Sequence, residues 1–276
     1  MLTERQKIIL WAIIEEHAKK ADPISSKALV GKRGFDIGAP MIRKEMNQLE
    51  QEGYLAQPHT SAGRVPTDKA YRLYIQEQLN RSNTTYRTND QTGLTAKETQ
   101  KIKDSLNKKW SDDQALLKEV SKLASGISKE LSVAGTVGGE NSFTCGFSNL
   151  FEEPEFKSFS NMNQIMRFMD NVDSYFDALW ETSRTFCSHE EVSHTHPVKI
   201  EKISQKVLEY EDMQVFIGIE NPIKEINEFT LITGKYQLPE GDTHSDKSPR
   251  GKQGFISLIG PKRMNYKRNM ALVDYI

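Results

Sequence analysis

Cysteine is scarce in this sequence. The 276 residues include two cysteines, Cys145 and Cys187, which form neither a metal-binding spacing nor a disulfide framework. Three histidines follow Cys187 closely, His189, His194 and His196, but their spacing matches no established zinc motif. We therefore expect thiols buried in a reducing cytoplasm, and we treat a metal site in this segment as the weaker alternative.

Long apolar runs are absent as well. No stretch approaches the ~18 consecutive apolar residues that a membrane span needs. The first seven residues, MLTERQK, lack the uncharged core of a signal peptide. Hydrophobic residues make up 37% of the chain, below the ~45–50% usual in globular domains. The sequence thus predicts a cytoplasmic protein without a membrane partner.

An excess of charge of one sign is also missing. Lys and Arg number 37 and Asp and Glu number 38, so the formal net charge is -1. This balance excludes a strongly basic, histone-like protein. Residues 1–90 hold 14 basic against 11 acidic residues (+3), whereas residues 91–276 hold 23 against 27 (-4). The split indicates a slightly basic N-terminal module and leaves nucleic-acid binding open.

Motifs of catalysis and cofactor binding are missing too. The sequence contains no nucleophile elbow and no paired carboxylates at a spacing that suits acid–base chemistry. The glycines of residues 135–139 lack the Lys-Ser/Thr pair of a phosphate-binding loop. We expect no enzymatic activity and no cofactor.

The N-terminal part, in contrast, carries an ordered series of helix and turn signals. Thr3 and Gln6 have the spacing of a capping box, which predicts a helix over 3–20. A Pro near its start and Gly53 after its end delimit a helix over 40–52. The other predicted elements are a short helix at 25–30, a Gly-rich turn at 31–38, a strand at 54–56, a turn at 59–64, a return at 65–67 and a helix at 68–79. This order predicts a winged helix-turn-helix.

The helix over 40–52 is the candidate recognition helix. Ile42, Met46 and Leu49 fall within one narrow arc and should face the core. The opposite face carries polar and charged residues of the kinds that read the major groove, since Arg pairs with guanine, Asn pairs with adenine and Lys holds phosphate. The candidate DNA-binding residues on this face are Pro40, Arg43, Lys44, Asn47 and Gln51.

The turn at 59–64 is the candidate wing. We expect His59, Thr60, Ser61 and Arg64 to contact a flanking phosphate or the minor groove. We assign base contact to Arg43 and Asn47. The competing interpretation is that an amphipathic helix with a charged outer face is merely solvated.

The remainder predicts an α+β domain. We divide the chain into a DNA-binding domain at 1–75, a linker and connecting helix at 76–110 and a second domain at 111–276. Predicted helices lie at 97–131, 164–181 and 264–275, predicted strands at 133–137, 142–147, 215–219, 229–233 and 255–259, and a polar loop at 239–253.

Several segments of the chain are long and unusual. The most distinctive is QPHTSAGRVPTD at 57–68, which follows IRKEM at 42–46 and LEQEGYL at 49–55. These segments resemble the N-terminal domain of one known family, HrcA, the heat-inducible transcription repressors. Later segments agree in order: GFSNLFEEPEF at 146–156 resembles the family's GGTSNLLEQPEF, IENP at 219–222 resembles GEENP, and IGPKRMNY at 259–266 resembles IGPTRMDY.

The resemblance implies a repressor that binds an inverted-repeat operator upstream of chaperone genes as a homodimer. It also implies a GAF-like core with an inserted dimerisation domain, and a chaperonin partner that keeps the repressor active. Two rival functions remain: a protein-interaction adaptor that lost DNA binding, and a repressor gated by a small ligand rather than by heat.

The chain departs from the family pattern in its middle and at one helix start. Residues 133–137 pass almost directly to the segment at 142–156, so we expect the inserted dimerisation domain to be reduced or missing. Gly38 stands where the family has a Ser-containing cap, so the helix from Pro40 should begin on backbone hydrogen bonds.

Overall fold

The computed structural model describes residues 2–31, 37–82, 93–138, 142–187, 208–210, 213–238 and 252–276. Several predictions lie outside these residues: the three histidines His189, His194 and His196, most of the turn at 31–38, residues 83–92 of the linker and residues 239–251 of the polar loop. The chain divides into two compact units, one of Met1–Asn83 with Lys262–Asn265, the other of Thr84–Pro261 with Tyr266–Ile276.

The first unit combines four helices with a two-stranded sheet among its described residues. Its elements are α1 (Glu4–Lys20), α2 (Ser26–Leu29), α3 (Ala39–Gln51), β1 (Leu55–Ala56), β2 (Val65–Pro66) and α4 (Asp68–Ser82). The predicted capping box starts α1: Gln6 N donates to Thr3 Oγ1 at 3.3 Å, and Thr3 N donates to Gln6 Oε1 at 2.9 Å. These local signals place the helix start as the sequence indicates.

The core of the first unit lies between α1, α3 and α4. Ile42, Met46 and Leu49 are buried, which confirms the predicted inner face of α3. Apolar residues of the other helices of this unit are buried as well, among them Ile9, Leu10, Ile13, Leu29 and Ile75. Burial of one stripe per helix leaves the outer face of α3 to the solvent.

The second unit is built on an antiparallel six-stranded sheet in the order β4-β3-β8-β7-β6-β5. The strands are β3 (Leu131–Thr136), β4 (Ser142–Cys145), β5 (Leu208–Tyr210), β6 (Met213–Ile217), β7 (Phe229–Gln237) and β8 (Gln253–Pro261). The long central pair β7 and β8 is in register from Phe229↔Pro261 to Gln237↔Gln253. This mixed architecture confirms the predicted α+β class.

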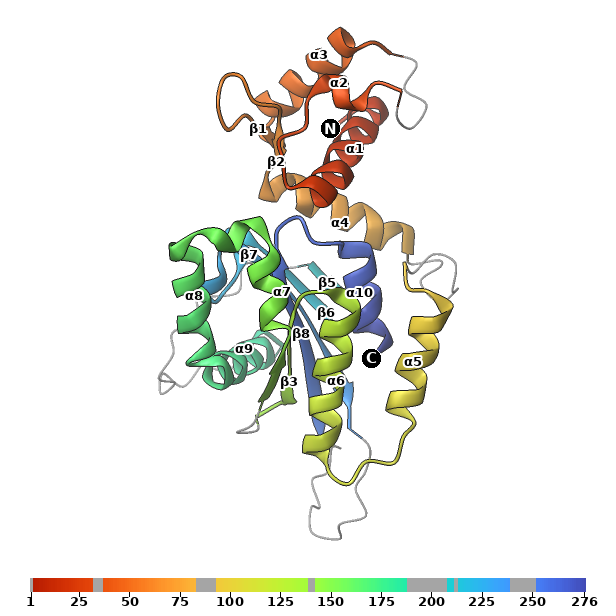
Figure 1. Ribbon diagram of the computed structural model, residues 1–276, viewed down its shortest axis with the longest axis vertical. Coiled ribbons are helices and arrows are strands. Elements are labelled where there is room, and N and C mark those ends of the chain that lie inside the picture. Colours follow the sequence, from red (N-terminus) through yellow and green to blue (C-terminus); the bar gives the residue numbers. More distant parts are fainter. Residues whose placement is uncertain are drawn as a thin grey trace. The chain divides into compact units, whose positions relative to one another are not determined.

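Helices cover both faces of the sheet (Figure 1). On one face, α7 (Phe147–Glu152), α8 (Phe159–Met169) and α9 (Val172–Cys187) enclose an aromatic core with Phe156, Phe216, Phe229 and Phe255. On the other face, α6 (Asp113–Ser128) contacts β3 and β8, and α10 (Tyr266–Tyr275) contacts β7 and β8. Thr230, between the inward-facing Phe229 and Leu231, bonds to Tyr266 of α10 at 2.8 Å. The alternation along β7 thus serves both layers.

Two predicted helices are each divided in two. Residues 97–131 form α5 (Ala96–Leu106) and α6, because the Asp112 side chain accepts from Ala115 N at 2.8 Å and starts a new helix. Residues 164–181 fall in α8 and α9, separated at Asp170 and Asn171. The predicted strand at 142–147 ends at Cys145, since Gly146 has a φ of +86° and no room for a Cβ beside Ser125.

Candidate nucleic-acid interface

The outer face of α3 presents the predicted reading residues. Pro40, Arg43, Lys44, Asn47 and Gln51 are all exposed, whereas the inner residues of the helix are buried. No side chain caps the helix: Gly38 is the N-cap, and its carbonyl accepts from Met41 N at 3.0 Å. The helix therefore begins on backbone bonds with Pro40 in its first turn, as the sequence indicates.

The loop between β1 and β2 is a second polar projection. The two strands pair as Leu55↔Pro66 and Ala56↔Val65. Within the loop, Gln57 Nε2 donates to Thr60 O at 2.9 Å and to Ala62 O at 3.0 Å. These bonds satisfy main-chain carbonyls inside the turn, and His59, Thr60 and Ser61 remain exposed at its tip.

The base of this loop is anchored on the segment before α2. Ile24 N donates to Arg64 O and Arg64 N donates to Ile24 O, each at 2.9 Å, which makes an isolated antiparallel bridge. A Cβ at Gly63 would lie 2.5 Å from the carbonyl of Ile24, so this close approach requires glycine. Sequence reasoning placed the loop correctly along the chain but did not identify Ile24 as its anchor.

Arg64 connects the loop to α3. Its Nε donates to Glu50 Oε2 at 2.8 Å, and its Nη2 donates to Asn47 Oδ1 at 2.9 Å. The structure thus brings together two predicted site residues, Asn47 and Arg64, and adds a third, Glu50. Glu50 went unnoticed because an acidic residue is an unexpected member of a DNA-binding surface. The available signal was its position three residues after Asn47, on the same face of the helix.

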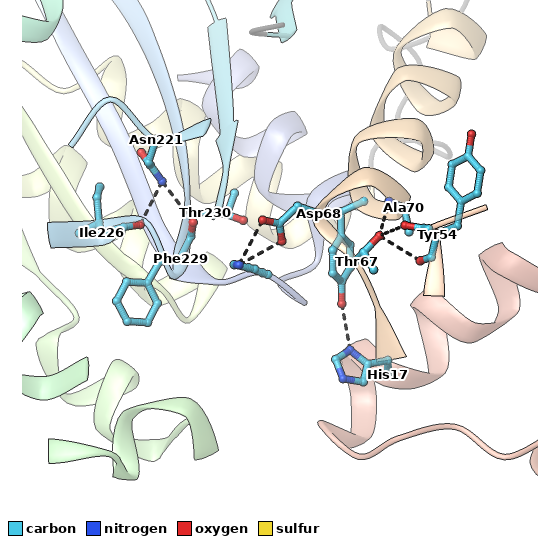
Figure 2. Close-up of polar contacts among 12 residues, drawn as sticks. His17, Tyr54, Thr67, Asp68, Ala70, Asn221, Ile226, Phe229 and Thr230 are labelled. Atoms are coloured by element: carbon cyan, nitrogen blue, oxygen red, sulfur yellow. Dashed lines mark hydrogen bonds and ion pairs between the residues drawn. The ribbon is translucent and has the colours of Figure 1, made fainter. Parts of the chain in front are cut away.

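The return from β2 into α4 is held by a dense set of polar contacts (Figure 2). Thr67 Oγ1 donates to Gly53 O at 2.8 Å and to Tyr54 O at 3.1 Å, and it accepts from Ala70 N at 3.4 Å. The last contact makes Thr67 the cap of α4. Lys69 Nζ donates to Glu52 O at 2.7 Å, at the end of α3. These contacts fix the loop strands relative to α3.

Two further contacts stabilise the same unit. His17 Nδ1 lies 2.9 Å from the Tyr71 hydroxyl, which joins α1 to α4 (Figure 2). Asp68, at the start of α4, pairs with Lys262 at 3.0 Å, and Arg263 Nη1 donates to Ala18 O at 3.0 Å. The turn Lys262–Asn265 therefore belongs to the packing of this unit.

The described residues give no support to a metal site or a membrane span as alternatives to the nucleic-acid interface. Within the described ranges no group of three His, Cys, Asp or Glu side chains could hold a metal ion. Cys145 is a free thiol, and it is partly rather than fully buried, in contrast to the prediction. Phe216 and Phe255 lie in the core of the second unit. No helix of the described part of the chain is long and apolar enough to span a bilayer.

Comparisons with known proteins point to one family. A family model described as the HrcA protein C-terminal domain matches residues 45–270. The heat-inducible transcription repressor HrcA of Thermodesulfovibrio yellowstonii is 27% identical over 343 aligned positions, which cover 99% of this chain and 95% of that protein. The protein of the same name from Geobacter sulfurreducens is 50% identical over 78 positions, which cover 28% of this chain and 23% of its own length.

A solved structure shares the fold. A crystal structure of a hypothetical protein superposes with a TM-score of 0.67 at 16% sequence identity, and the match covers 100% of this chain and 96% of the other.

Proposed function

The chain belongs to the HrcA family, and from this premise we propose that it is a heat-inducible transcription repressor that binds operator DNA upstream of chaperone genes. The target is an inverted repeat, and the binding species is a homodimer in the cytoplasm. A chaperonin keeps the repressor active. The operator, the homodimer and the chaperonin are what membership of this family implies for this chain.

In this proposal, residues 1–75 form a winged helix-turn-helix, in which α3 is the recognition helix and the β1–β2 loop is the wing. The residues that contact DNA are Pro40, Arg43, Lys44, Asn47, Gln51, His59, Thr60, Ser61 and Arg64. The observation that carries the assignment is the exposure of the α3 set beside a wing tied to the same helix through Arg64. An α-helix fits the major groove, and these side chains suit base edges and phosphates.

The second part of the proposal concerns residues 76–276. Residues 76–110 link the DNA-binding domain to a GAF-like regulatory and dimerisation domain at 111–276. The inserted dimerisation domain of the family is reduced or missing. In support, the alignment with the Thermodesulfovibrio yellowstonii protein spans 343 positions, more than the 276 residues of this chain, so part of that relative has no counterpart here.

The decisive experiment measures binding of the full chain to a duplex that carries the inverted repeat found upstream of the source organism's chaperone genes. A random duplex of equal length is the control. We expect binding of the operator to be at least ~10³-fold tighter at physiological salt. Equal and weak binding of both duplexes would exclude the repressor and favour the adaptor. Specific binding that a small metabolite releases, with no response to chaperonin, would favour the ligand-gated repressor.

A further inference from the structure

We propose that Glu50 is a positioning residue for base recognition: it holds Arg64 so that Arg64 fixes the side-chain amide of Asn47 in one orientation. The inference rests on the proposed role of α3 as the recognition helix. The inference gives a role to Glu50, an acidic residue that cannot itself bind phosphate. It also means that Arg64 orients Asn47 in addition to its contact with DNA.

The geometry of the three side chains is that of a relay. Arg64 Nε bonds to Glu50 Oε2 at 2.8 Å and Arg64 Nη2 bonds to Asn47 Oδ1 at 2.9 Å. Glu50 and Asn47 lie three residues apart on α3, so one guanidinium spans both. The Arg64 side chain is 15% exposed and that of Glu50 is 32% exposed. The guanidinium is therefore held in a fixed position, from which it also contacts DNA in the proposed complex.

The main chain of Arg64 is held as firmly as its side chain. Two hydrogen bonds of 2.9 Å join its backbone to Ile24. The preceding Gly63 lies against the same segment. The backbone of Arg64 is therefore positioned by the wing, and its guanidinium is positioned by Glu50. An ion pair with defined geometry at both ends orders the side chain before DNA arrives.

The chemistry explains why such a relay serves Asn47. An amide side chain has a donor end and an acceptor end of nearly equal size, and adenine is read only when the two ends meet N7 and N6 in the right order. Arginine can only donate, so its bond to Asn47 selects the carbonyl oxygen for that side. The Asn47 carbonyl oxygen keeps a second lone pair that can accept from adenine N6, and Nδ2 remains available to donate to N7. Asn47 is thereby pre-organised, which lowers the ordering cost of binding.

The test uses Glu50→Gln in the full chain, with Glu52→Gln as the matched control. Both variants remove one negative charge near the end of α3, and Glu50 alone of the two bonds to Arg64 among the contacts described above. Affinity is measured on the operator, on operators with each A·T pair of the half-site changed in turn, and on a random duplex, over a series of salt concentrations.

We expect Glu50→Gln to reduce discrimination at one A·T pair by roughly tenfold, within the range a bidentate contact supplies. Binding to the random duplex should not weaken, because no positive charge is lost. Glu52→Gln should match the wild type. In an Asn47→Ala background, Glu50→Gln should have no further effect on discrimination, because the two residues act through one contact.

Arg64→Lys is the second variant, and it keeps the charge while it removes the planar fork. We expect the same loss of discrimination with an unchanged salt slope. Full discrimination in both variants, or an equal effect of Glu50→Gln with and without Asn47, would overturn the inference. The wild-type arm separates the two proposals: specific operator binding that Glu50→Gln leaves intact defeats only the positioning role, whereas absence of specific binding by the wild type defeats the proposed function.

Discussion

At the scale of single residues, the first unit depends on one close approach of two main chains. Gly63 lies against the carbonyl of Ile24, where a Cβ would stand at 2.5 Å. No flexible side chain is available to give way, because the obstructing atoms belong to the backbone. The position of the β1–β2 loop thus depends on the absence of a side chain at residue 63.

Gly63→Ala should destabilise the first unit by about 1–3 kcal/mol, because the added methyl group overpacks the loop against residue 24. Chemical denaturation followed by near-ultraviolet circular dichroism measures the change. Gly126→Ala in α6 is the control of opposite sign: nothing lies within 4 Å of its Cβ position, and Ala gains roughly 0.5–1 kcal/mol over Gly inside a helix. A Gly63→Ala variant as stable as the wild type would contradict the close approach.

Arg43 and Lys44 are adjacent, exposed and equal in charge, so they form a matched pair. Arg43→Ala should cost about 1–3 kcal/mol on the operator and relax preference at one base pair, as expected of a base contact. Lys44→Ala should weaken all duplexes alike and reduce the salt slope by about one. Fluorescence anisotropy over a salt series separates the two effects. If Arg43→Ala lost as much affinity on random DNA, Arg43 would be a backbone contact.

At the scale of elements, α5 shows how a cap is reinforced from a distant helix. Glu98 accepts from Thr95 N at 2.9 Å in a capping box, and Arg268 of α10 bonds to the same carboxylate. Partial burial of Glu98 acts to raise its pKa, but the hydrogen bonds from Thr95 and the Arg268 guanidinium outweigh it, so the pKa is lowered. Ionised Glu98 therefore stabilises the attachment of α5.

Glu98→Gln should lower the free energy of unfolding of the second unit by ~1 kcal/mol near neutral pH, the usual scale of a lost cap. A carboxyl whose folded pKa is lowered stabilises the protein above its unfolded pKa, and this contribution disappears as pH falls through the folded value. The difference in free energy of unfolding between wild type and variant should therefore narrow below pH ~4.3, the ordinary pKa of a Glu side chain. Urea denaturation at several pH values gives the gap, and a constant gap would refute the carboxylate's role.

Element boundaries were the least predictable part of the fold. The apolar pattern over 97–131 fits one long helix, yet Asp112 begins a second helix there. Likewise Asp170 N bonds back to Met166 O and ends α8. Helical periodicity reports which residues are buried, and it can continue across a short break between two helices; α5, for example, packs against α6. The breaks arise from single capping bonds that the period does not register.

At the scale of the whole molecule, an inverted-repeat target matches a two-fold dimer. We expect the intact operator to bind one dimer and a duplex with a single half-site to bind about a hundredfold more weakly, since the second contact becomes intramolecular. Analytical ultracentrifugation of the protein and titration of both duplexes measure this. Equal affinity for duplexes with one and with two half-sites would show that the protein binds DNA as a monomer.

The chaperonin dependence is tested on the same complex. After mild heating, addition of chaperonin should raise the fraction of protein active in operator binding, because a partner that favours the folded state shifts the population towards it. Serum albumin at equal mass concentration is the control. If chaperonin and albumin left the same active fraction, this part of the proposal would fail.

Much of the molecule follows from the sequence because its signals are local. The helical spacing of apolar residues determined which face of α3 is buried. The capping box determined the start of α1, and the turn-rich segment at 59–64 determined the loop between the two short strands. The mixed strand and helix patterns also determined the α+β class. These features depend on residues within one or two turns of each other, where spacing alone decides which side chains meet.

Only the tertiary structure decided what the side chains of the interface touch. The sequence predicts that Arg64 contacts a phosphate or the minor groove. In the structure its side chain bonds to Glu50 and Asn47, which lie 14 and 17 residues earlier in the chain. Gly63 reads as a turn former, yet it is needed because Ile24 passes beside it. A long side chain has many rotamers and many possible partners, and its choice depends on how α3 and the β1–β2 loop pack, a non-local outcome that no residue pattern encodes.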